Sequence, residues 1–223
     1  MNAPILKATD LSKTFSFPQK IEILQNINLT VYPGDTVAIM GASGEGKTTL
    51  LHILGSLDKP NSGSVEILGK PANAKTRLHE IGFVFQNYNL LEDLSLLENV
   101  LLPAKIARMP TIEGSPIYKR ATALLEKVNL IQRKDYPITL LSGGEKQRGA
   151  LARAFINNPS LILADEPSGN LDHVSSKEVH NLLISMAKEE KKGLIVATHD
   201  LELARLCEKK WQLKEACLFP VNL

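Results

Sequence analysis

The stretch that decides the fold is Gly41-Ala42-Ser43-Gly44-Glu45-Gly46-Lys47-Thr48-Thr49. Its first eight residues fit the pattern G-x-x-x-x-G-K-[ST], which is typical of a phosphate-binding loop. The apolar, β-branched run before the loop predicts a buried strand, and the periodicity after it predicts a helix. The alternative is a glycine-rich turn with an incidental lysine, but a strand before the loop and a helix after it favour nucleotide binding.

The residue types of this loop suit a bound triphosphate. Glycines let the backbone wrap tightly, so that N–H groups point at phosphate oxygens. The helix that follows adds roughly half a positive charge at its first turn. Lys47 would then reach the β- and γ-phosphates, and the Thr48 hydroxyl would ligate Mg²⁺. The loop therefore predicts a nucleoside triphosphate and Mg²⁺ as cofactors.

Composition excludes several classes of protein. The formal net charge of the 223 residues is only +2, so no electrostatic footprint indicates nucleic acid as a partner. No apolar run approaches the roughly 20 residues needed to cross a bilayer, and no signal peptide is evident. Cys207 and Cys217 match no metal spacing, so we expect idle thiols in a reducing cytosol. These features indicate a soluble intracellular protein.

Apolar runs along the chain predict a sheet of buried parallel strands. Continuous apolar segments alternate with helical patterns, which is typical of a parallel sheet covered on both faces. The predicted buried strands are residues 36–40, 81–85, 161–164 and 194–197. A helix is expected over about 175–190. The predicted fold class is therefore α/β.

The N-terminal region has a different pattern. Residues 5–11 predict a strand, and the polar residues 12–14 predict a turn after it. Strict alternation of apolar and polar residues over 27–31 predicts a half-exposed antiparallel strand. A short strand is also expected at 64–68, after a turn at 60–63. We therefore expect an antiparallel β-subdomain at this end of the chain.

A helical pattern fills the middle of the chain. It runs from Asn87 to about Leu140 and is broken by Pro110, Gly114 and Pro116. We interpret it as an inserted helical subdomain, about residues 87–144. The core with its β-subdomain would then comprise about residues 1–86 and 145–223 of a single domain.

Polar side chains follow three of the predicted buried strands. Asp165 and Glu166 end one strand, where Asp165 would hold Mg²⁺ and Glu166 would polarise an attacking water. His199 ends another and could contact a γ-phosphate. Gln86 ends a third, where its amide could ligate Mg²⁺ and touch the water. Acids also collect at strand ends because the chain is leaving the core, so these assignments depend on the phosphate loop. The other four histidines are expected to be structural or solvent-facing: His52, His79, His173 and His180.

A second possible anion site precedes a predicted helix at Leu141-Ser142-Gly143-Gly144-Glu145. A serine hydroxyl and exposed N–H groups at a helix start can bind an anion. Ser142 followed by Glu145 also reads as an ordinary capping box, and both interpretations can hold at once. One nucleotide already occupies the first loop, so a second γ-phosphate site is explained by a head-to-tail dimer in which each chain completes the other's site.

Taken together, these segments resemble the ATP-binding-cassette (ABC) ATPases over essentially the whole chain. The motifs occur in the family's order: Walker A at 41–49, Q-loop at Gln86, signature at 141–148, Walker B at 161–166, D-loop at 168–172 and switch histidine His199. The resemblance implies a P-loop NTPase fold with a RecA-like, mostly parallel sheet, and it implies ATP as the nucleotide. It further implies that Ser142, Gly143 and Gly144 contact the partner's γ-phosphate and that Asp172 links the two sites.

The resemblance also assigns an aromatic side chain to the adenine base. Phe15 matches the residue that stacks on adenine in the family. The alternative is that Phe15 or Phe17 merely packs under the sheet. Three positions depart from the family's usual pattern without removing a catalytic group: Ala42, Glu92 and Gly149.

Within the family, segments 82–91, 97–100 and 166–172 are similar to the branch that contains the ATPases of lipoprotein release and of macrolide export. This similarity implies a homodimeric ATPase bound to integral-membrane permease subunits on the cytoplasmic side of the inner membrane. A permease helix would dock near residues 87–97, where four side chains could contact it or could instead form the subdomain's own core: Tyr88, Leu90, Leu91 and Leu94. A DNA- or ribosome-acting ATPase is disfavoured, because no coiled-coil insertion or basic linker is visible. A regulatory ATPase of the cell-division type shares most of these motifs and stays open.

Overall fold

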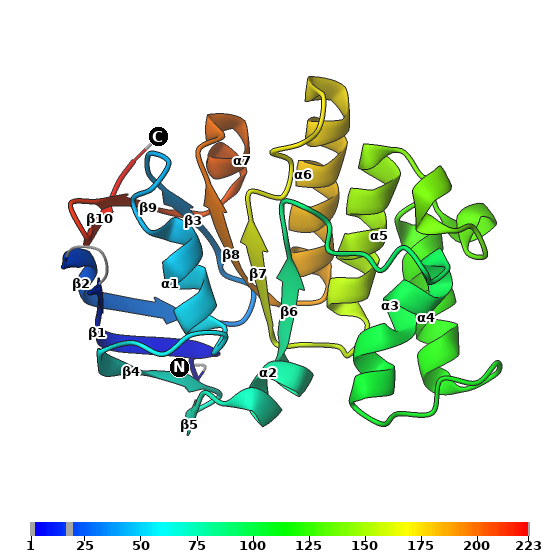
Figure 1. Cartoon of the computed structure of the whole chain (residues 1–223), viewed down its shortest axis with the longest axis horizontal. Helices are drawn as coiled ribbons and strands as arrows, with labels where there is room; N and C mark the ends of the chain where they lie inside the picture. Colours follow the sequence, from blue (N-terminus) through cyan, green and yellow to red (C-terminus); the bar gives the residue numbers. More distant parts are fainter. Residues whose placement is uncertain (1–2, 17–19, 223) are drawn as a thin grey trace.

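The computed structural model describes residues 3–16 and 20–222, which form two β-sheets with helices around them (Figure 1). In spatial order the central sheet consists of β10 (Cys217–Pro220), β9 (Lys209–Lys214), β3 (Thr36–Met40), β8 (Gly193–Thr198), β7 (Leu161–Asp165) and β6 (Ile81–Val84). All neighbouring pairs are parallel except β10 with β9. The predicted parallel sheet of buried strands is confirmed.

Side chains alternate between the two faces of this sheet, so that each face builds its own core. On β3, Ala38 and Met40 join the larger apolar cluster, whereas Val37 and Ile39 join the second one. The larger cluster includes residues of α5 (Gly143–Phe155), α6 (His173–Glu189) and α7 (Leu201–Leu206). The second includes residues of α1 (Lys47–Leu54) and of the other sheet. The continuous apolar runs are explained by this coverage on both faces.

The second sheet is antiparallel and lies at the left of Figure 1. Its spatial order is β2 (Ile21–Val31), β1 (Leu6–Phe15), β4 (Ser62–Ile67) and β5 (Lys70–Pro71). The alternation over 27–31 is confirmed, because Ile27, Leu29 and Val31 are buried while Asn28 is exposed. The sequence thus predicted the antiparallel β-subdomain correctly.

The turn predicted at residues 12–14 is wrong, because β1 continues through these residues to Phe15. The strand absorbs the polar run by irregular pairing with β2, with register shifts after Ala8 and after Leu11. Asp10 and Asn26 both adopt left-handed backbone angles, with φ of 49° at each. Such bulges bend a strand without ending it, and polar composition alone cannot distinguish a bulge from a turn.

The middle of the chain is helical, as predicted, and lies at the right of Figure 1. It contains α3 (Leu96–Ile106), α4 (Pro116–Lys127) and two short 3₁₀ turns at Ile131–Arg133 and Ile138–Leu140. A capping box between Ser95 and Glu98 begins α3, and a second serine cap begins α4. Of the predicted breakers, Pro110 and Gly114 lie between α3 and α4, and Pro116 is the first residue of α4.

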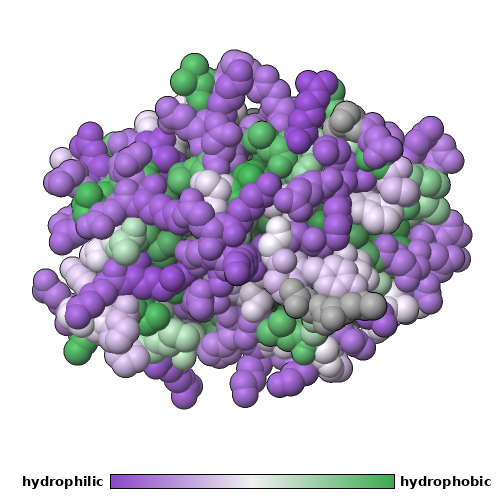
Figure 2. Space-filling model, turned by 180° about the vertical axis from the view of Figure 1, so that it is seen from behind, coloured by the Kyte–Doolittle hydropathy of each residue, from purple (hydrophilic) through white to green (hydrophobic). Residues whose placement is uncertain are grey.

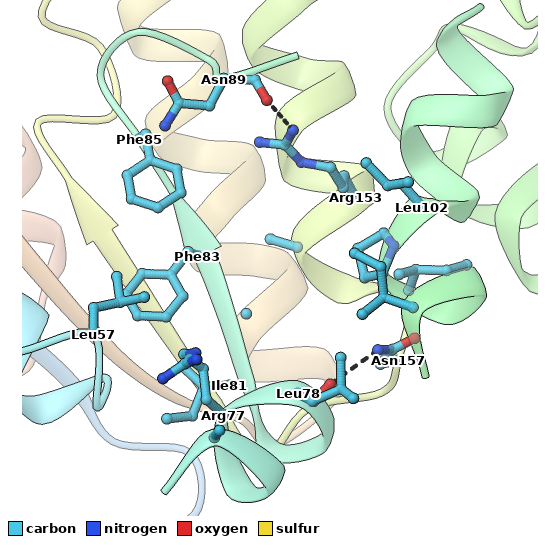
Figure 3. A pocket seen from close by; sticks show the side chains of 16 residues that line it. Leu57, Arg77, Leu78, Ile81, Phe83, Phe85, Asn89, Leu102, Arg153 and Asn157 are labelled. Carbon is cyan, nitrogen blue, oxygen red and sulfur yellow. Dashed lines mark hydrogen bonds between the residues drawn. The ribbon is translucent and has the colours of Figure 1, made fainter. Parts of the chain in front are cut away.

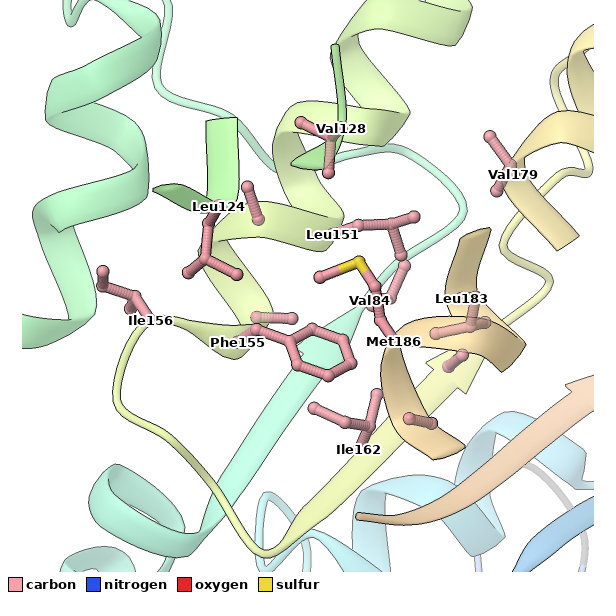
Figure 4. Packing of buried hydrophobic residues seen from close by; sticks show 14 of the residues in the cluster. Val84, Leu124, Val128, Leu151, Phe155, Ile156, Ile162, Val179, Leu183 and Met186 are labelled. Atoms are coloured by element: carbon pink, nitrogen blue, oxygen red, sulfur yellow. The ribbon is translucent and has the colours of Figure 1, made fainter. Parts of the chain in front are cut away.

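The helical middle region and the central sheet share one apolar core through α5. This helix packs against α3, α4, α6 and β6. Phe155, at the end of α5, is fully buried and lies beside Ile162 of β7 and Met186 of α6 (Figure 4). Removing such a ring typically costs about 3–5 kcal/mol, because the space it leaves cannot close completely. The orientation of α5 is therefore fixed by packing at its C-terminal end.

Some elements were not expected from the sequence. Helix α2 (Ala74–Glu80) was not predicted, and Asn73 caps it by accepting from two backbone N–H groups. The elements α7, β9 and β10 were not predicted at all. Figure 2 shows one face of the molecule, on which hydrophobic residues are scattered among hydrophilic ones. Within residues 3–16 and 20–222, no helix is both long and apolar enough to span a bilayer.

Candidate nucleotide-binding site

The loop at 41–49 links β3 to α1 and has a conformation that requires glycine. Gly46 has a φ of 97° and immediately precedes the first turn of α1. A Cβ atom at this position would lie 2.4 Å from the Cγ2 atom of Ile23, so a larger residue does not fit. The Glu45 carboxylate accepts a hydrogen bond of 2.8 Å from the Ala42 N–H and thereby closes the loop. The loop is built as a cradle whose free N–H groups and helix start suit an anion.

Lys47 bends back over this loop and is only 7% exposed. Its Nζ atom donates to the carbonyl oxygens of Gly41 at 2.8 Å and Ala42 at 3.0 Å, and lies 3.9 Å from a carboxylate oxygen of Glu166. Burying an ammonium group costs free energy unless an anion is hydrogen-bonded to it, and Glu166 is too distant for such a bond. An incoming phosphate would supply that anion.

A pocket of about 550 Å³ opens above the loop. Its described lining residues are Ile23, Ser43, Gly44, Gly46, Lys47, Thr48, Thr49, Gln86, Asp165, Glu166 and His199. Predicted site residues from four separate segments thus meet here: the phosphate loop, Gln86, Asp165 with Glu166, and His199. Three members of the loop do not line this pocket, Gly41, Ala42 and Glu45, and they act on the loop's shape instead.

Asp165 provides the test of whether the site suits a cation. Burial raises the pKa of this carboxyl group above its ordinary value, although a hydrogen bond from Thr48 acts in the opposite direction. Its Oδ1 atom is buried and has no hydrogen-bond partner among the described residues. A buried carboxylate oxygen with no donor, beside a hydroxyl group, is a combination that suits a hard divalent cation. The residues present therefore fit Mg²⁺.

Glu166 is held in the pocket by the end of β8. Its carboxylate accepts from the Thr198 hydroxyl at 3.1 Å and from the His199 N–H at 3.1 Å, and it lies 2.9 Å from His199 Nδ1. The backbone of Glu166 is left-handed, with φ at 42°, an unusual angle for a residue with a side chain. These contacts fix a carboxylate at the mouth of the phosphate loop, where it can accept a proton from water.

Gln86 is exposed and lines the pocket from the end of β6. The loop after Glu166 contacts it, because Asn170 donates to the Gln86 carbonyl oxygen at 3.1 Å and to the Asn87 side chain at 3.0 Å. The sequence interpretation missed Asn170 as a contact of Gln86 and Thr198 as a contact of Glu166. A hydroxyl group at the end of a buried strand was the available signal for Thr198.

The structure does not bring the predicted second anion site to this pocket. Ser142 caps α5 in a capping box with Glu145, and Ser142, Gly143 and Gly144 are absent from the pocket lining. Asp172 caps α6 and accepts from Val174 N and Ser175 N at 3.0 Å. These hydrogen bonds, with that of the Ser175 hydroxyl first among them, hold the pKa of Asp172 below its ordinary value.

Phe15 also lies outside the pocket lining. Its ring is 44% exposed, and Lys13 Nζ lies 5.3 Å from the ring centroid. The ring belongs to neither apolar cluster of the described residues. Phe17, the alternative, lies outside the described residues.

A second pocket, of about 470 Å³, separates β6 and α2 from α3 and α5 (Figure 3). Its walls include Phe83 and Phe85, whose rings stack 5.5 Å apart, together with Leu102 and Ile106 of α3. None of the four candidate docking side chains at 87–97 is among its described lining residues, and Asn89 alone of that segment lines it. We refer to this pocket as the α2–α3 groove.

Arg153 joins the α2–α3 groove to the nucleotide site. It lies near the end of α5 and donates to the carbonyl oxygens of Tyr88 and Asn89 (Figure 3). Both of those residues have positive φ, 60° and 50°, and they follow Gln86 by two and three residues. Burial lowers the pKa of Arg153 to about 10, so the guanidinium stays charged at neutral pH. Arg77 is the other arginine of the groove, and no acidic residue is among the described lining residues.

The fold and this arrangement of loops define a P-loop ATPase with the motif order of the ABC ATPases. The family model for ABC transporters matches residues 24–169, and the chain belongs to this family of ATP-hydrolysing subunits of transport complexes.

Known relatives resemble the chain over almost its whole length. It is 46% identical over 219 residues to the lipoprotein-releasing system ATP-binding protein LolD of Protochlamydia amoebophila (strain UWE25), with 96% of each chain covered. The dimeric structure of the bacterial ABC transporter cassette MJ0796 matches with a TM-score of 0.86 and 39% identity, again covering 96% of each chain. A post-hydrolysis dimer of the same cassette, bound to ADP and Pi, matches with a TM-score of 0.86 and 38% identity.

Proposed function

We propose that this chain is the ATPase subunit of a lipoprotein-releasing complex, working as a homodimer on the cytoplasmic face of the inner membrane. The observation that carries the ATPase chemistry is the meeting of the phosphate loop, Asp165, Glu166 and His199 in one pocket. Lipoprotein as the cargo is supported by the 46% identity to a protein of that system.

In the proposed mechanism, residues of one chain hold the triphosphate. The N–H groups of the loop and Lys47 bind the β- and γ-phosphates, and Lys47 exchanges its carbonyl contacts for phosphate oxygens. Thr48, Asp165 and Gln86 would hold Mg²⁺, which when bound neutralises phosphate charge. Phe15, the last residue of β1, stacks on the adenine base.

Glu166 orients and polarises the water that attacks the γ-phosphorus atom. Thr198 and the His199 N–H hold its carboxylate, so its position is set before the nucleotide arrives. The His199 ring, with a side chain that is 72% exposed, is free to turn from Glu166 towards the γ-phosphate.

The γ-phosphate also needs donors that the same chain does not supply. Ser142, Gly143 and Gly144 begin α5 away from the pocket, and Ser142 is exposed. A partner chain in head-to-tail orientation would present this helix start to the nucleotide, and Asp172 would lie between the two sites. The dimeric cassette structures support such an arrangement.

Mixing two inactive variants tests the shared site. Lys47→Ala removes a phosphate contact but keeps the start of α5, whereas Ser142→Arg blocks the start of α5 but keeps the loop. Each variant alone is expected to hydrolyse ATP at a background rate. Random pairing makes about half of the dimers mixed, each with one intact site of two, so the mixture should recover up to about a quarter of wild-type activity. Hydrolysis measured across mixing ratios checks this, and no recovery would contradict a site shared between chains.

The α2–α3 groove is the proposed docking site for a cytoplasmic helix of the permease. Its stacked phenylalanines and α3 side chains suit an apolar helix face, and its two arginines suit a carboxylate on that helix. Docking there would contact α3 and the Tyr88–Asn89 segment, which Arg153 ties to α5. The permease would thus contact the segment that follows Gln86 and, through Arg153, also affect α5.

Ile106→Asp tests the docking site and the identity of the partner together. Ile106 is 60% exposed, so the substitution costs little folding stability, but a buried carboxylate would oppose docking. Ile112, which is 76% exposed and does not line the groove, supplies the matched control Ile112→Asp. An affinity-tagged chain should purify with a lipoprotein-binding permease, and Ile106→Asp should reduce recovery by about tenfold or more while Ile112→Asp does not.

The same purification can contradict the proposal. A macrolide or peptide exporter, or a cell-division membrane protein, as the recovered partner would show that the cargo is not lipoprotein. Equal recovery with both aspartate variants would instead exclude the α2–α3 groove. Basal hydrolysis by the isolated chain should be unchanged in either variant, which separates docking from catalysis.

A further inference from the structure

A buried histidine on α6 touches both loops that hold the hydrolytic residues. His180 is 2% exposed, and its Nε2 atom lies 2.6 Å from the Oγ atom of Ser168 and 3.8 Å from a carboxylate oxygen of Asp200. Ser168 is itself only 9% exposed and follows Glu166 by two residues. The sequence had suggested a structural or solvent-facing role for His180. Its contacts with Ser168 and Asp200 indicate a functional role in addition.

The two loops are bonded to each other on the pocket side as well. Thr198 accepts from the Asp200 N–H at 3.0 Å and donates to Glu166 at 3.1 Å. Glu166 and Thr198 therefore join the two loops at the nucleotide pocket, whereas His180 hydrogen-bonds Ser168 of one loop and lies 3.8 Å from Asp200 of the other. The hydrogen bond with Ser168 is buried and is therefore protected from competition by water.

The loop after Glu166 needs such an anchor. It begins with a left-handed residue and forms only short internal hydrogen bonds, from Gly169 N to Glu166 O and from Leu171 N to Ser168 O. Asn170 ties its tip to the Gln86 segment. The contact with His180 is what fixes Ser168 against α6. Movement of Ser168 would shift Glu166 on one side and Asp172 on the other.

The protonation state of His180 decides which partner its Nε2 atom prefers. In the neutral ring, Nε2 and the Ser168 hydroxyl share one hydrogen bond, with the direction set by the tautomer. A protonated ring carries a hydrogen on Nε2, and the Asp200 carboxylate then competes with Ser168 for a charge-assisted bond.

The surrounding charges act in both directions on His180. Burial, the largest effect, lowers its pKa, and His173 adds to this, whereas Asp200 and Glu202 raise it. Lys177 lies 3.7 Å from Glu202 and offsets part of that charge. The ring is therefore neutral at pH 7 and above, and it takes up a proton only in acid.

We propose that His180 is a positioning residue for ATP hydrolysis, whose neutral ring holds Ser168, and with it the 168–172 loop, against α6, and whose protonation turns Nε2 towards Asp200 and releases Ser168. The inference rests on the role proposed above for Glu166. Because His180 does not line the nucleotide pocket, it acts on the rate of hydrolysis and not on the affinity for ATP.

The test compares kcat and KM for ATP between pH 5.5 and 8.5 in the full chain. His180→Gln places an amide near the Nε2 position and cannot titrate in this range, and His180→Leu removes the hydrogen bond. His79→Gln, on α2 and outside the pocket, is the matched control. At pH 8 we expect the glutamine variant to stay within about twofold of wild type. The leucine variant should lose about three- to tenfold in kcat with an unchanged KM, the effect of one lost hydrogen bond.

In acid the order should change. Wild type and His79→Gln should lose kcat below about pH 6.5, and His180→Gln should lose about threefold less. A leucine variant with wild-type kcat at every pH, or a glutamine variant with the wild-type acid profile, would overturn the proposal. If the leucine variant does not fold, the glutamine profile decides alone. An inactive wild-type chain at every pH would instead contradict the proposed function together with this inference.

Discussion

Glu166→Gln is expected to reduce ATP hydrolysis by about 10²- to 10³-fold, because a positioned general base contributes factors of this size. The amide has the same shape as the carboxylate, and its single oxygen, placed at the Oε2 position, can still accept from the Thr198 hydroxyl and, at the longer distance of 3.4 Å, from the His199 N–H. It cannot take a proton from water. ATP affinity should remain within about twofold of wild type, so the variant should accumulate as a nucleotide-bound dimer.

Single-turnover hydrolysis, equilibrium ATP binding and light scattering with ATP present would together check this result. Glu189→Gln is the matched control, since Glu189 lies near the end of the same helix as His180 and pairs with Lys127 on the surface. Turnover close to wild type in Glu166→Gln would show that another group polarises the water. If Glu166→Gln formed nucleotide-bound dimers but hydrolysed ATP at the wild-type rate, the conclusion would be the same.

Lys47→Ala is expected to weaken ATP binding itself, by about ten- to a hundredfold. Lys47 is the only lysine or arginine among the described residues that line the pocket, and a charge-assisted bond to phosphate is roughly twice as strong as a neutral one. The substitution also leaves the carbonyl oxygens of Gly41 and Ala42 without their donor. Lys47→Met keeps the aliphatic part of the side chain and separates lost charge from lost packing.

Titration calorimetry with ATP and with ADP gives the measurement, and the Tm without nucleotide shows whether the loop has kept its fold. Lys119→Ala, an exposed lysine on α4, is the control. Unchanged affinity for ATP in both Lys47 variants would rule out this loop as the phosphate site. A lower affinity for ATP with little change for ADP would assign Lys47 mainly to the γ-phosphate.

The sequence predicted the parallel sheet and the nucleotide pocket well, for a physical reason. Strands buried on both faces must be apolar throughout, so runs such as 161–164 and 194–197 are visible without a structure. The carboxyl ends of parallel strands meet at one edge. Residues that end separate strands, including Gln86, Asp165 and His199, were therefore expected together, and they line one pocket.

Features that depend on distant contacts were not predictable in this way. The polar residues 12–14 continue β1 because β2 and β4 pair with this strand. Local composition does not show which strands will pair. The α2–α3 groove takes its walls from four elements, so the candidate docking residues at 87–97 were only near it. The contact of His180 with Ser168 joins a helix to a loop twelve residues earlier. The helical pattern over 175–190 does not show which residue His180 contacts, so the sequence left it as structural or solvent-facing.

Helix α5 has a consequence for energy exchange between the membrane and the nucleotide. It starts at Ser142, where a partner's nucleotide would bind, and Arg153 near its end grips the Tyr88–Asn89 segment beside the α2–α3 groove. Thirteen helical residues span about 20 Å, so a single rod joins the two sites. Thermodynamic linkage then requires reciprocity. If a docked permease helix changes the affinity for ATP by some factor, bound ATP changes the affinity for that helix by the same factor. Binding events at the permease and ATP binding can in this way change each other's affinity without any direct contact between cargo and nucleotide.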